Sequence, residues 1–256
     1  MSLEFLQPDG AVAHAGRTPV ARSPMEVATR ADGARFEVRE GWNVPVAFGE
    51  DDPSGATVGV ADVSHLPKVE VQARVEVLPG VMAAASGGAF RHEFGVAQRI
   101  DGAWWCLLKP DRALVLGGEG TGARQRVEAA ADGAEGYVSV LDLRTAYGAL
   151  TVVGPQARET FARFTALDLR PKSTPVGGLR PGSVARTPGL VIREDEDRFL
   201  MVFGAALGQY VWEQVLDAAR RLGGGPIGVD RLGPLGAREA GGAGAAPSKE
   251  RLTASA

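Results

Sequence analysis

The chain has 256 residues, of which 45% are hydrophobic and 23% are charged, and its formal net charge is −3 at pH 7. This composition is typical of a globular protein with one large or two modest domains and a sizeable core. Acidic and basic residues are interspersed, so we expect no nucleic-acid partner. No apolar run approaches the roughly 20 residues that span a bilayer, and the N-terminus lacks a secretion signal. The sequence therefore predicts a cytoplasmic protein without a membrane partner.

Cysteine and histidine are too scarce and too scattered for familiar metal or nucleophile motifs. Cys106 lies in an apolar stretch, which favours a buried structural thiol over a reactive one. His14, His65 and His92 are far apart in the chain, and there is no HExxH or CxxC pair. GxSxG, GxxxxGK[ST] and GxGxxG patterns are also missing from the sequence. We therefore expect no metal site.

The first predicted elements follow an arm at residues 1–22 that lacks hydrophobic periodicity. Ser23 and Pro24 are a typical cap and first-turn residue, so a short helix is predicted over 24–32. A strand is predicted over 35–39. The apolar phrase GWNVPVAFG at 41–49 contains a proline, which favours an ordered loop or an edge strand.

The stretch GVADVSHLPKVEV at residues 59–71 is predicted to form a strand, a tight corner and a second strand, because Pro67 interrupts two extended pieces. The corner brings Ser64, His65 and Lys68 between apolar positions. Polar side chains gathered at a strand end often form a functional site. The alternative is a structural corner whose polar groups are satisfied within the protein, which is the commoner case.

The rest of the chain alternates strands and helices, although residues 80–88 show no decisive pattern. Residues 103–108 and 113–116 form the clearest hairpin, with KPDR as its turn. Strands at 138–143 and 149–154 are predicted to be joined by a turn around Tyr147 and Gly148. The other expected elements are helices at 125–131, after Pro155 and at 207–221, strands at 184–186, 189–193 and 199–203, and a polar tail beyond Glu239.

This order predicts an α+β protein in which two ferredoxin-like, split β-α-β units of antiparallel sheet form one compact body with a central cleft. The expected parts are an arm (1–22), a first unit (23–120), a second unit (121–240) and a disordered tail (241–256). VADVS at 60–64 is echoed by VLDLR at 140–144. The echo is short, and short strand patterns also repeat by chance.

Several phrases occur in an order that resembles the glycine-cleavage T-protein family. They are RSPMEVATRADGARFEVREGWNVPVAFG, GVADVSHLPKVEV, ALTVVGPQARETF, IREDEDRFLMVF and GPLGARE, spread over residues 23–240, and D-V-S-H is the most specific. The family contains folate-dependent aminomethyltransferases and relatives, among them the gamma subunit of heterotetrameric sarcosine oxidase. The resemblance implies a folate-binding body around a central channel, with tetrahydrofolate as cofactor and a small amine as substrate.

The resemblance also assigns residues. Asp101 stands where the family has the first carboxylate of an acidic pair that includes its catalytic acid, whereas Gly102 replaces the second. Glu196 stands where the family has a glutamate that contacts the pterin. Arg238 matches part of a late A-R-D-x-L-R motif, and the chain ends where the family's third domain would begin.

A pterin needs an apolar slot, a carboxylate that accepts its N–H groups and an aromatic ring to stack on. Glu196, Tyr147 and Trp42 are candidates for this role, and Ser64 and His65 are further cofactor-binding candidates. Asp101 is the candidate acid. The alternatives are that Asp101 is a turn residue, because Asp-Gly favours hairpin turns, and that Glu196 is a solvated charge.

Two functions follow. The first is a tetrahydrofolate-binding, aminomethyltransferase-like protein that moves a one-carbon group from an amine to folate. The alternative is a non-catalytic, gamma-like subunit of a larger sarcosine-oxidase-type complex, which the missing acidic partner and the chain length favour. The GWNVPVAFG phrase resembles the transferases more than the gamma subunits.

Overall fold

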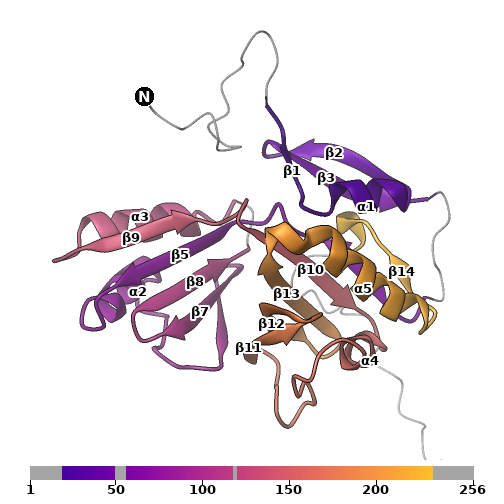
Figure 1. The fold of residues 1–256 in the computed structure, drawn as a ribbon. Coiled ribbons are helices and arrows are strands. Elements are labelled where there is room, and N and C mark those ends of the chain that lie inside the picture. The colour runs from indigo at the N-terminus through magenta and orange to yellow at the C-terminus, as the bar shows by residue number, and fades with distance from the viewer. Residues whose placement is uncertain (1–18, 50–55, 118–119, 233–256) are drawn as a thin grey trace, which may run out of the picture.

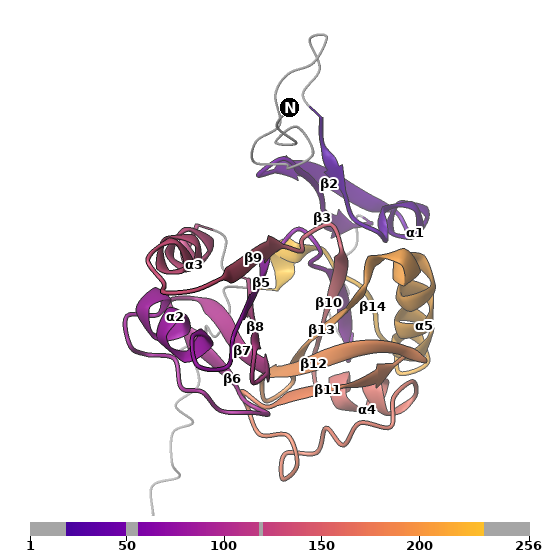
Figure 2. The ribbon, with the colours of Figure 1, turned by 60° about the vertical axis from the view of Figure 1, so that its left-hand side comes forward.

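The computed structural model describes residues 19–49, 56–117 and 120–232 and contains two large sheets and one small one (Figure 1). The two large sheets face each other, and helices cover the outer face of each (Figure 2). The expected α+β class is confirmed. Most of the expected N-terminal arm and all of the expected tail lie outside the described residues.

The five-stranded sheet has the order β6-β7-β8-β5-β9 and carries two helices. The side chains of the sheet and of these helices share one core, which includes Val71, Met82, Trp105 and Val127. The predicted hairpin and the predicted helix after it are confirmed as β7-β8 and α3. The bounds are β5 Lys68–Ala73, α2 Leu78–Ala85, β6 Ala97–Ile100, β7 Ala103–Lys109, β8 Arg112–Leu116, α3 Ala123–Asp132 and β9 Val138–Asp142.

The six-stranded sheet has the order β11-β12-β13-β10-β4-β14. Its elements come from two separate parts of the chain, β4 and the run from β10 to η4. The bounds are β4 Gly59–Asp62, β10 Tyr147–Val153, α4 Ala157–Ala162, β11 Leu179–Val184, β12 Thr187–Asp195, β13 Arg198–Gly204, η3 Ala205–Leu207, α5 Gly208–Arg220, β14 Gly225–Pro226 and η4 Val229–Arg231.

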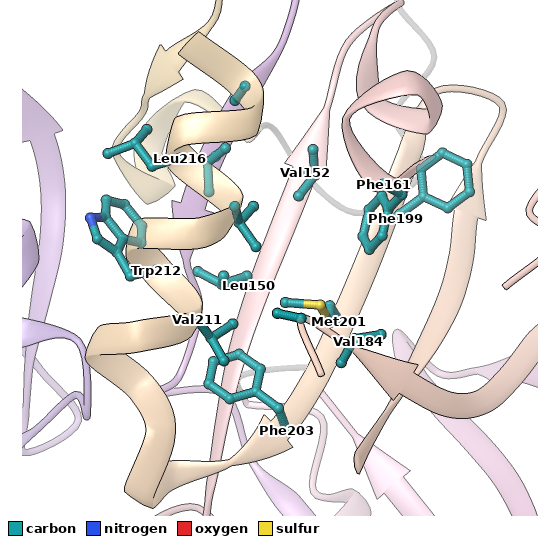
Figure 3. Close-up of a cluster of buried hydrophobic side chains, with 14 of the residues drawn as sticks. Leu150, Val152, Phe161, Val184, Phe199, Met201, Phe203, Val211, Trp212 and Leu216 are labelled. Carbon is teal, nitrogen blue, oxygen red and sulfur yellow. The ribbon is translucent and has the colours of Figure 1, made fainter. Parts of the chain in front are cut away.

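Helix α5 forms because apolar residues recur every three or four positions along it. In Figure 3, Val211 lies on the strand side of α5, whereas Trp212 lies on the opposite side of the helix, where its ring stacks on Phe48 of the small sheet. Val211, Trp212, Val215 and Leu216 are all at most 1% exposed. They pack with strand residues such as Leu150. Truncation of a buried tryptophan costs about 3–5 kcal/mol. Because Trp212 stacks on Phe48 and its Nε1 atom donates to Asp32 Oδ2 at 2.7 Å, it is a principal link between α5 and the N-terminal segment.

The small sheet has the order β1-β3-β2, with helix α1 between β1 and β2 in the chain. The prediction of a loop or edge strand for GWNVPVAFG is wrong, because this phrase forms the central strand. Pro45 is tolerated because the register with β2 shifts between Arg35 and Phe36, opposite the proline. The bounds are β1 Ala21–Arg22, α1 Glu26–Ala31, β2 Ala34–Arg39 and β3 Trp42–Phe48.

A third core fills the space between the two large sheets, and it includes Trp104, Leu114, Ile192 and Val202. Cys106 belongs to this core and is fully buried, as its apolar neighbours predicted. Burial raises the pKa of the Cys106 thiol. The thiol is therefore structural.

The chain crosses between the large sheets twice. The predicted strand-corner-strand at 59–71 is confirmed, but β4 and β5 lie in different sheets. The strands predicted at 138–143 and 149–154 are confirmed as β9 and β10, but they lie in different sheets, since β9 pairs with β5 and β10 pairs with β4 and β13. The turn predicted around Tyr147 and Gly148 is wrong, because both residues belong to β10. Each large sheet thus takes strands from both sides of residue 120, and the two crossovers run antiparallel to each other.

Candidate functional site

The two crossovers have the same local structure. Asp62 ends β4 and Asp142 ends β9, and the Oδ1 atom of each accepts the backbone N–H two residues later, from Ser64 and Arg144, at 2.9 Å. The backbone N–H of Val63 donates to the Ala149 carbonyl at 3.0 Å, and the backbone N–H of Leu143 donates to the Lys68 carbonyl at 2.8 Å. Each corner is thus bonded to the strand that follows the other corner. The sequence echo between residues 60–64 and 140–144 therefore corresponds to two equivalent corners.

Asp62 is a fully buried carboxylate at the first corner. Its Oδ2 atom accepts a hydrogen bond from the Ser23 hydroxyl, which in turn accepts the Met25 N–H at 3.0 Å. Burial raises the pKa of Asp62, and its hydrogen bonds only partly oppose this rise. Asp62 thus ties the first corner to the segment that leads into α1.

Ser64 and His65 are the corner residues that the sequence proposed as cofactor ligands. Ser64 is fully buried, and its hydroxyl accepts the Ala149 N–H at 3.1 Å and donates to the Ala149 carbonyl at 3.4 Å. His65 is half-buried and lies near Asp62. The Ser64 hydroxyl is therefore engaged within the protein, as in the structural alternative.

Lys68 is the least expected member of the corner, because its side chain is almost wholly buried. Its Nζ atom donates to the carbonyls of Ser64 at 2.7 Å and Leu66 at 2.9 Å. Burial lowers the pKa of Lys68 to about 7, although Asp62 and Asp142 oppose this effect. The amine thus fixes the corner through backbone carbonyls in a site where its charge is costly.

The second corner is held by arginines instead of a serine. Arg144 donates from Nε and Nη2 to Asp142 Oδ2 at 3.0 and 2.7 Å, and Arg124 of α3 donates from Nη1 at 2.8 Å. These bonds and charges hold the pKa of Asp142 below its ordinary value despite its partial burial. Both arginines also line a cavity of about 600 Å³ beside the start of α3.

Asp101, the candidate acid, occupies the turn between β6 and β7. Its φ of 47° and the φ of 80° at Gly102 fit a type I′ hairpin turn, which Asp-Gly favours. The Asp101 side chain is 68% exposed and lies 3.4 Å from Arg126 Nη2. The structure therefore places Asp101 at an open turn, where the turn alternative expected it.

Glu196 is exposed in the turn between β12 and β13, whereas Glu194 is buried. Glu194 accepts hydrogen bonds from Trp104 Nε1 at 2.9 Å and from Arg198 Nε at 3.0 Å, and burial raises its pKa. Because Trp104 belongs to the five-stranded sheet, Glu194 links the two large sheets. Sequence reasoning missed it within the run of four acidic residues between Arg193 and Arg198.

The aromatic candidates lie in different sheets. Trp42 is 1% exposed in the core of the small sheet. Tyr147 begins β10 and lines a cavity of about 390 Å³ between the two large sheets. The remaining candidate, Arg238, lies outside the described residues. Tyr147 is thus the candidate that borders a cavity large enough for a small molecule.

A metal centre has no counterpart in the described ranges, where no three histidine, cysteine, aspartate or glutamate residues gather as ligands. Within the same ranges, no helix is long and apolar enough to cross a membrane.

Comparison with known proteins identifies relatives in two groups. Over 230 residues the chain is 25% identical to an aminomethyltransferase of Streptomyces coelicolor. The aligned region covers 83% of this chain and 61% of the relative. The chain thus spans about three fifths of the length of this curated relative. Glycine cleavage system aminomethyltransferase T from Bartonella henselae has a similar fold, with a TM-score of 0.65 and 17% identity over 82% of this chain and 60% of that one.

The second group is sarcosine oxidase. A chain of the heterotetrameric enzyme from Corynebacterium sp. U-96, solved with pyrrole 2-carboxylate, has a TM-score of 0.59 and 22% identity over 68% of this chain and 90% of that one. The model of the sarcosine oxidase, gamma subunit family matches residues 80–221, which is more than half of the chain. The chain therefore belongs to the sarcosine oxidase gamma subunit family.

Proposed function

We propose that this chain is a non-catalytic, gamma-type subunit of a larger sarcosine-oxidase-type complex. The observation that carries the proposal is the match of the gamma subunit family over residues 80–221. The match includes most of α2, the β7-β8 hairpin, the central strands of the two large sheets and α5. It therefore covers most of the body rather than one motif.

The positions of the predicted catalytic acid and of the predicted pterin-binding glutamate support this function. Asp101 and Glu196 lie in hairpin turns of different sheets, and both side chains face solvent. One-carbon transfer needs an acid held close to the reacting nitrogen in a site with restricted water. An exposed turn carboxylate with an arginine partner lacks that restriction, so the amine would react on another chain of the complex.

The test is to tag the chain in its own host and to measure the native mass of what it purifies with. We expect a stoichiometric assembly with larger chains that oxidises sarcosine, and loss of assembled oxidase when the gene for this chain is deleted. A chain that purifies alone, and whose deletion leaves oxidase assembly and activity unchanged, would contradict the proposal.

A second function, tetrahydrofolate binding with one-carbon transfer from an amine, is favoured by the 25% identity to an aminomethyltransferase over 230 residues. The strand orders β7-β8-β5-β9 and β12-β13-β10-β4 support the further proposal that both sheets are ferredoxin-like units. In this function Asp101 is the acid, and Glu196, Tyr147, Trp42, Arg238, Ser64 and His65 hold the cofactor.

Calorimetric titration of the purified chain with tetrahydrofolate under reducing conditions separates the two functions. Micromolar binding that weakens at least tenfold in Glu196→Ala, together with amine-dependent one-carbon transfer that is lost in Asp101→Ala, would establish the transferase. The gamma-type proposal predicts no transfer by the isolated chain. The matched control is Glu37→Ala, since Glu37 is an exposed carboxylate of the small sheet.

A further inference from the structure

The cavity between the two large sheets has apolar walls and a charged side. Its volume is about 390 Å³, within the range of about 300–1,000 Å³ that is typical of small-molecule sites. Leu114 of β8 faces Leu190 and Val202 of the other sheet across this space. Figure 2 shows β5 and β8 on one side of the intersheet region and β10 and β13 on the other. The charged residues Glu70, Lys109 and Arg112 all come from the five-stranded sheet.

Glu70 is a buried carboxylate with unused hydrogen-bonding capacity. The residue is 8% exposed and lines the cavity. Within residues 19–49, 56–117 and 120–232, its oxygens accept no hydrogen bond, and its ion-pair partner, Arg112 Nη1, is 3.7 Å away. This distance allows Coulomb attraction but is too long for a hydrogen bond. A buried carboxylate normally accepts several hydrogen bonds, so Glu70 is incompletely satisfied.

Arg112 is incompletely satisfied as well. Its Nη2 atom makes one long hydrogen bond, 3.4 Å to Gln72 Oε1, and its buried Nε atom has no partner in the described part of the chain. The Glu70 side chain is 10% exposed and the Arg112 side chain is 32% exposed, so Glu70 carries the cost of a buried charge with few of the bonds that usually offset it, while Arg112 lies at the open side of the cavity. A bound molecule with both a donor and an acceptor group would supply the missing hydrogen bonds of Glu70 and Arg112.

We propose that this cavity binds a small apolar α-amino acid as its zwitterion. The ammonium group donates to Glu70, the carboxylate accepts from the guanidinium of Arg112 beside the Lys109 ammonium, and the side chain packs against the apolar wall of Leu114, Leu190 and Val202.

The charges favour a zwitterion over simpler ligands. A lone amine would face two cationic side chains, and a lone carboxylate would face Glu70. An uncharged hydrocarbon would leave Glu70 and Arg112 as they are. A zwitterion places each of its charges next to the opposite charge of the protein and adds no net charge to the cavity. This site goes beyond the proposed subunit role and does not depend on the identity of any partner chain.

The test is calorimetric titration of the full chain with L-leucine and with L-phenylalanine. Two analogues of L-phenylalanine each lack one of its charged groups: phenethylamine lacks the carboxylate, and 3-phenylpropanoate lacks the ammonium. We expect both amino acids to bind and each analogue to bind at least tenfold more weakly than L-phenylalanine. Glu70→Gln keeps the shape but removes the charge, so it should weaken amino acid binding about 10-fold to 100-fold. Glu37→Gln, which removes an exposed carboxylate elsewhere, should leave binding unchanged.

Four results would overturn the proposal: no heat from either amino acid at millimolar concentration, equal binding by the wild type and Glu70→Gln, binding of phenethylamine as tight as that of L-phenylalanine, or displacement of the amino acid by tetrahydrofolate. If Glu70→Gln loses its circular dichroism spectrum, Arg112→Lys takes its place, because it keeps the positive charge but removes the planar fork. Arg112→Lys should weaken L-phenylalanine more than phenethylamine, and an equal effect on both would also count against the proposal.

Discussion

Replacement of the buried Lys68 by methionine should change how stability depends on pH. Burial lowers the pKa of Lys68 from 10.5 to about 7, while Asp62 and Asp142 oppose this fall and Arg144 adds to it. Between these two pH values the unfolded chain holds a proton that the folded chain has lost, so the free energy of unfolding rises with pH. The slope for one proton is about 1.4 kcal/mol per pH unit, which gives roughly 5 kcal/mol over the whole window.

Lys68→Met removes this titration and keeps an unbranched side chain. The free energy of unfolding, measured in urea by tryptophan fluorescence from pH 6.5 to 10, should therefore rise in the wild type relative to Lys68→Met as pH increases. Other lysines titrate equally in both proteins and cancel in the difference. Lys172→Met is the matched control, because Lys172 is exposed. Parallel pH profiles for the wild type and Lys68→Met would show that the Lys68 amine ionises as in water, and the reasoning would be wrong.

Three further predictions concern the carboxylates Asp62, Glu194 and Glu196. Because burial raises the pKa of Asp62 above 3.8, the folded chain holds the extra proton, and stability relative to Asp62→Asn should fall as pH rises from about 4; a flat difference in urea titrations would contradict this. Glu194→Ala removes the buried acceptor of Trp104 Nε1 and Arg198 Nε, so it should cost about 2–4 kcal/mol, and a loss below about 0.5 kcal/mol would refute the link between the sheets. Glu196→Ala, at an exposed turn, should change the free energy of unfolding by less than about 0.5 kcal/mol, and a larger loss in the same assay would show a buried contact.

Local patterns predicted the elements whose signals are complete within a short window. The turn KPDR between two apolar runs specified the β7-β8 hairpin, and the apolar spacing of α5 specified its buried face. Pro67 correctly marked the corner between β4 and β5. The prediction that Ser23 caps the helix was wrong, because α1 begins at Glu26 with Met25 as its N-cap residue and has no side-chain cap hydrogen bond; the Ser23 hydroxyl instead accepts the Met25 N–H just before the helix.

The partners of the strands depended on contacts between distant parts of the chain. A short connection between two strands permits either a hairpin in one sheet or a crossover to another, and the four residues between β9 and β10 do not distinguish these cases. The crossover follows from pairing of β10 with β4 and of β9 with β5, each far away in sequence. No local pattern contains that information.

The candidate site was harder to predict for a related reason. In β12 the residues on both faces are buried, so alternation does not show which glutamate points inward, and the register shift between Arg193 and Asp195 changes the phase. Glu194 therefore looked like part of a solvated run of charges. Lys68 was noticed for its polarity, but it is buried at a place where the second corner lies against the first, since the Leu143 N–H donates to the Lys68 carbonyl and Asp142 and Arg144 lie near its amine.

The native mass of the tagged chain purified from its own host tests the central claim most directly. We predict a stoichiometric assembly with larger chains that oxidises sarcosine and dissociates only under conditions that unfold a subunit. A monomer that binds tetrahydrofolate and transfers a one-carbon group from an amine without any partner would contradict the gamma-type role and establish an aminomethyltransferase.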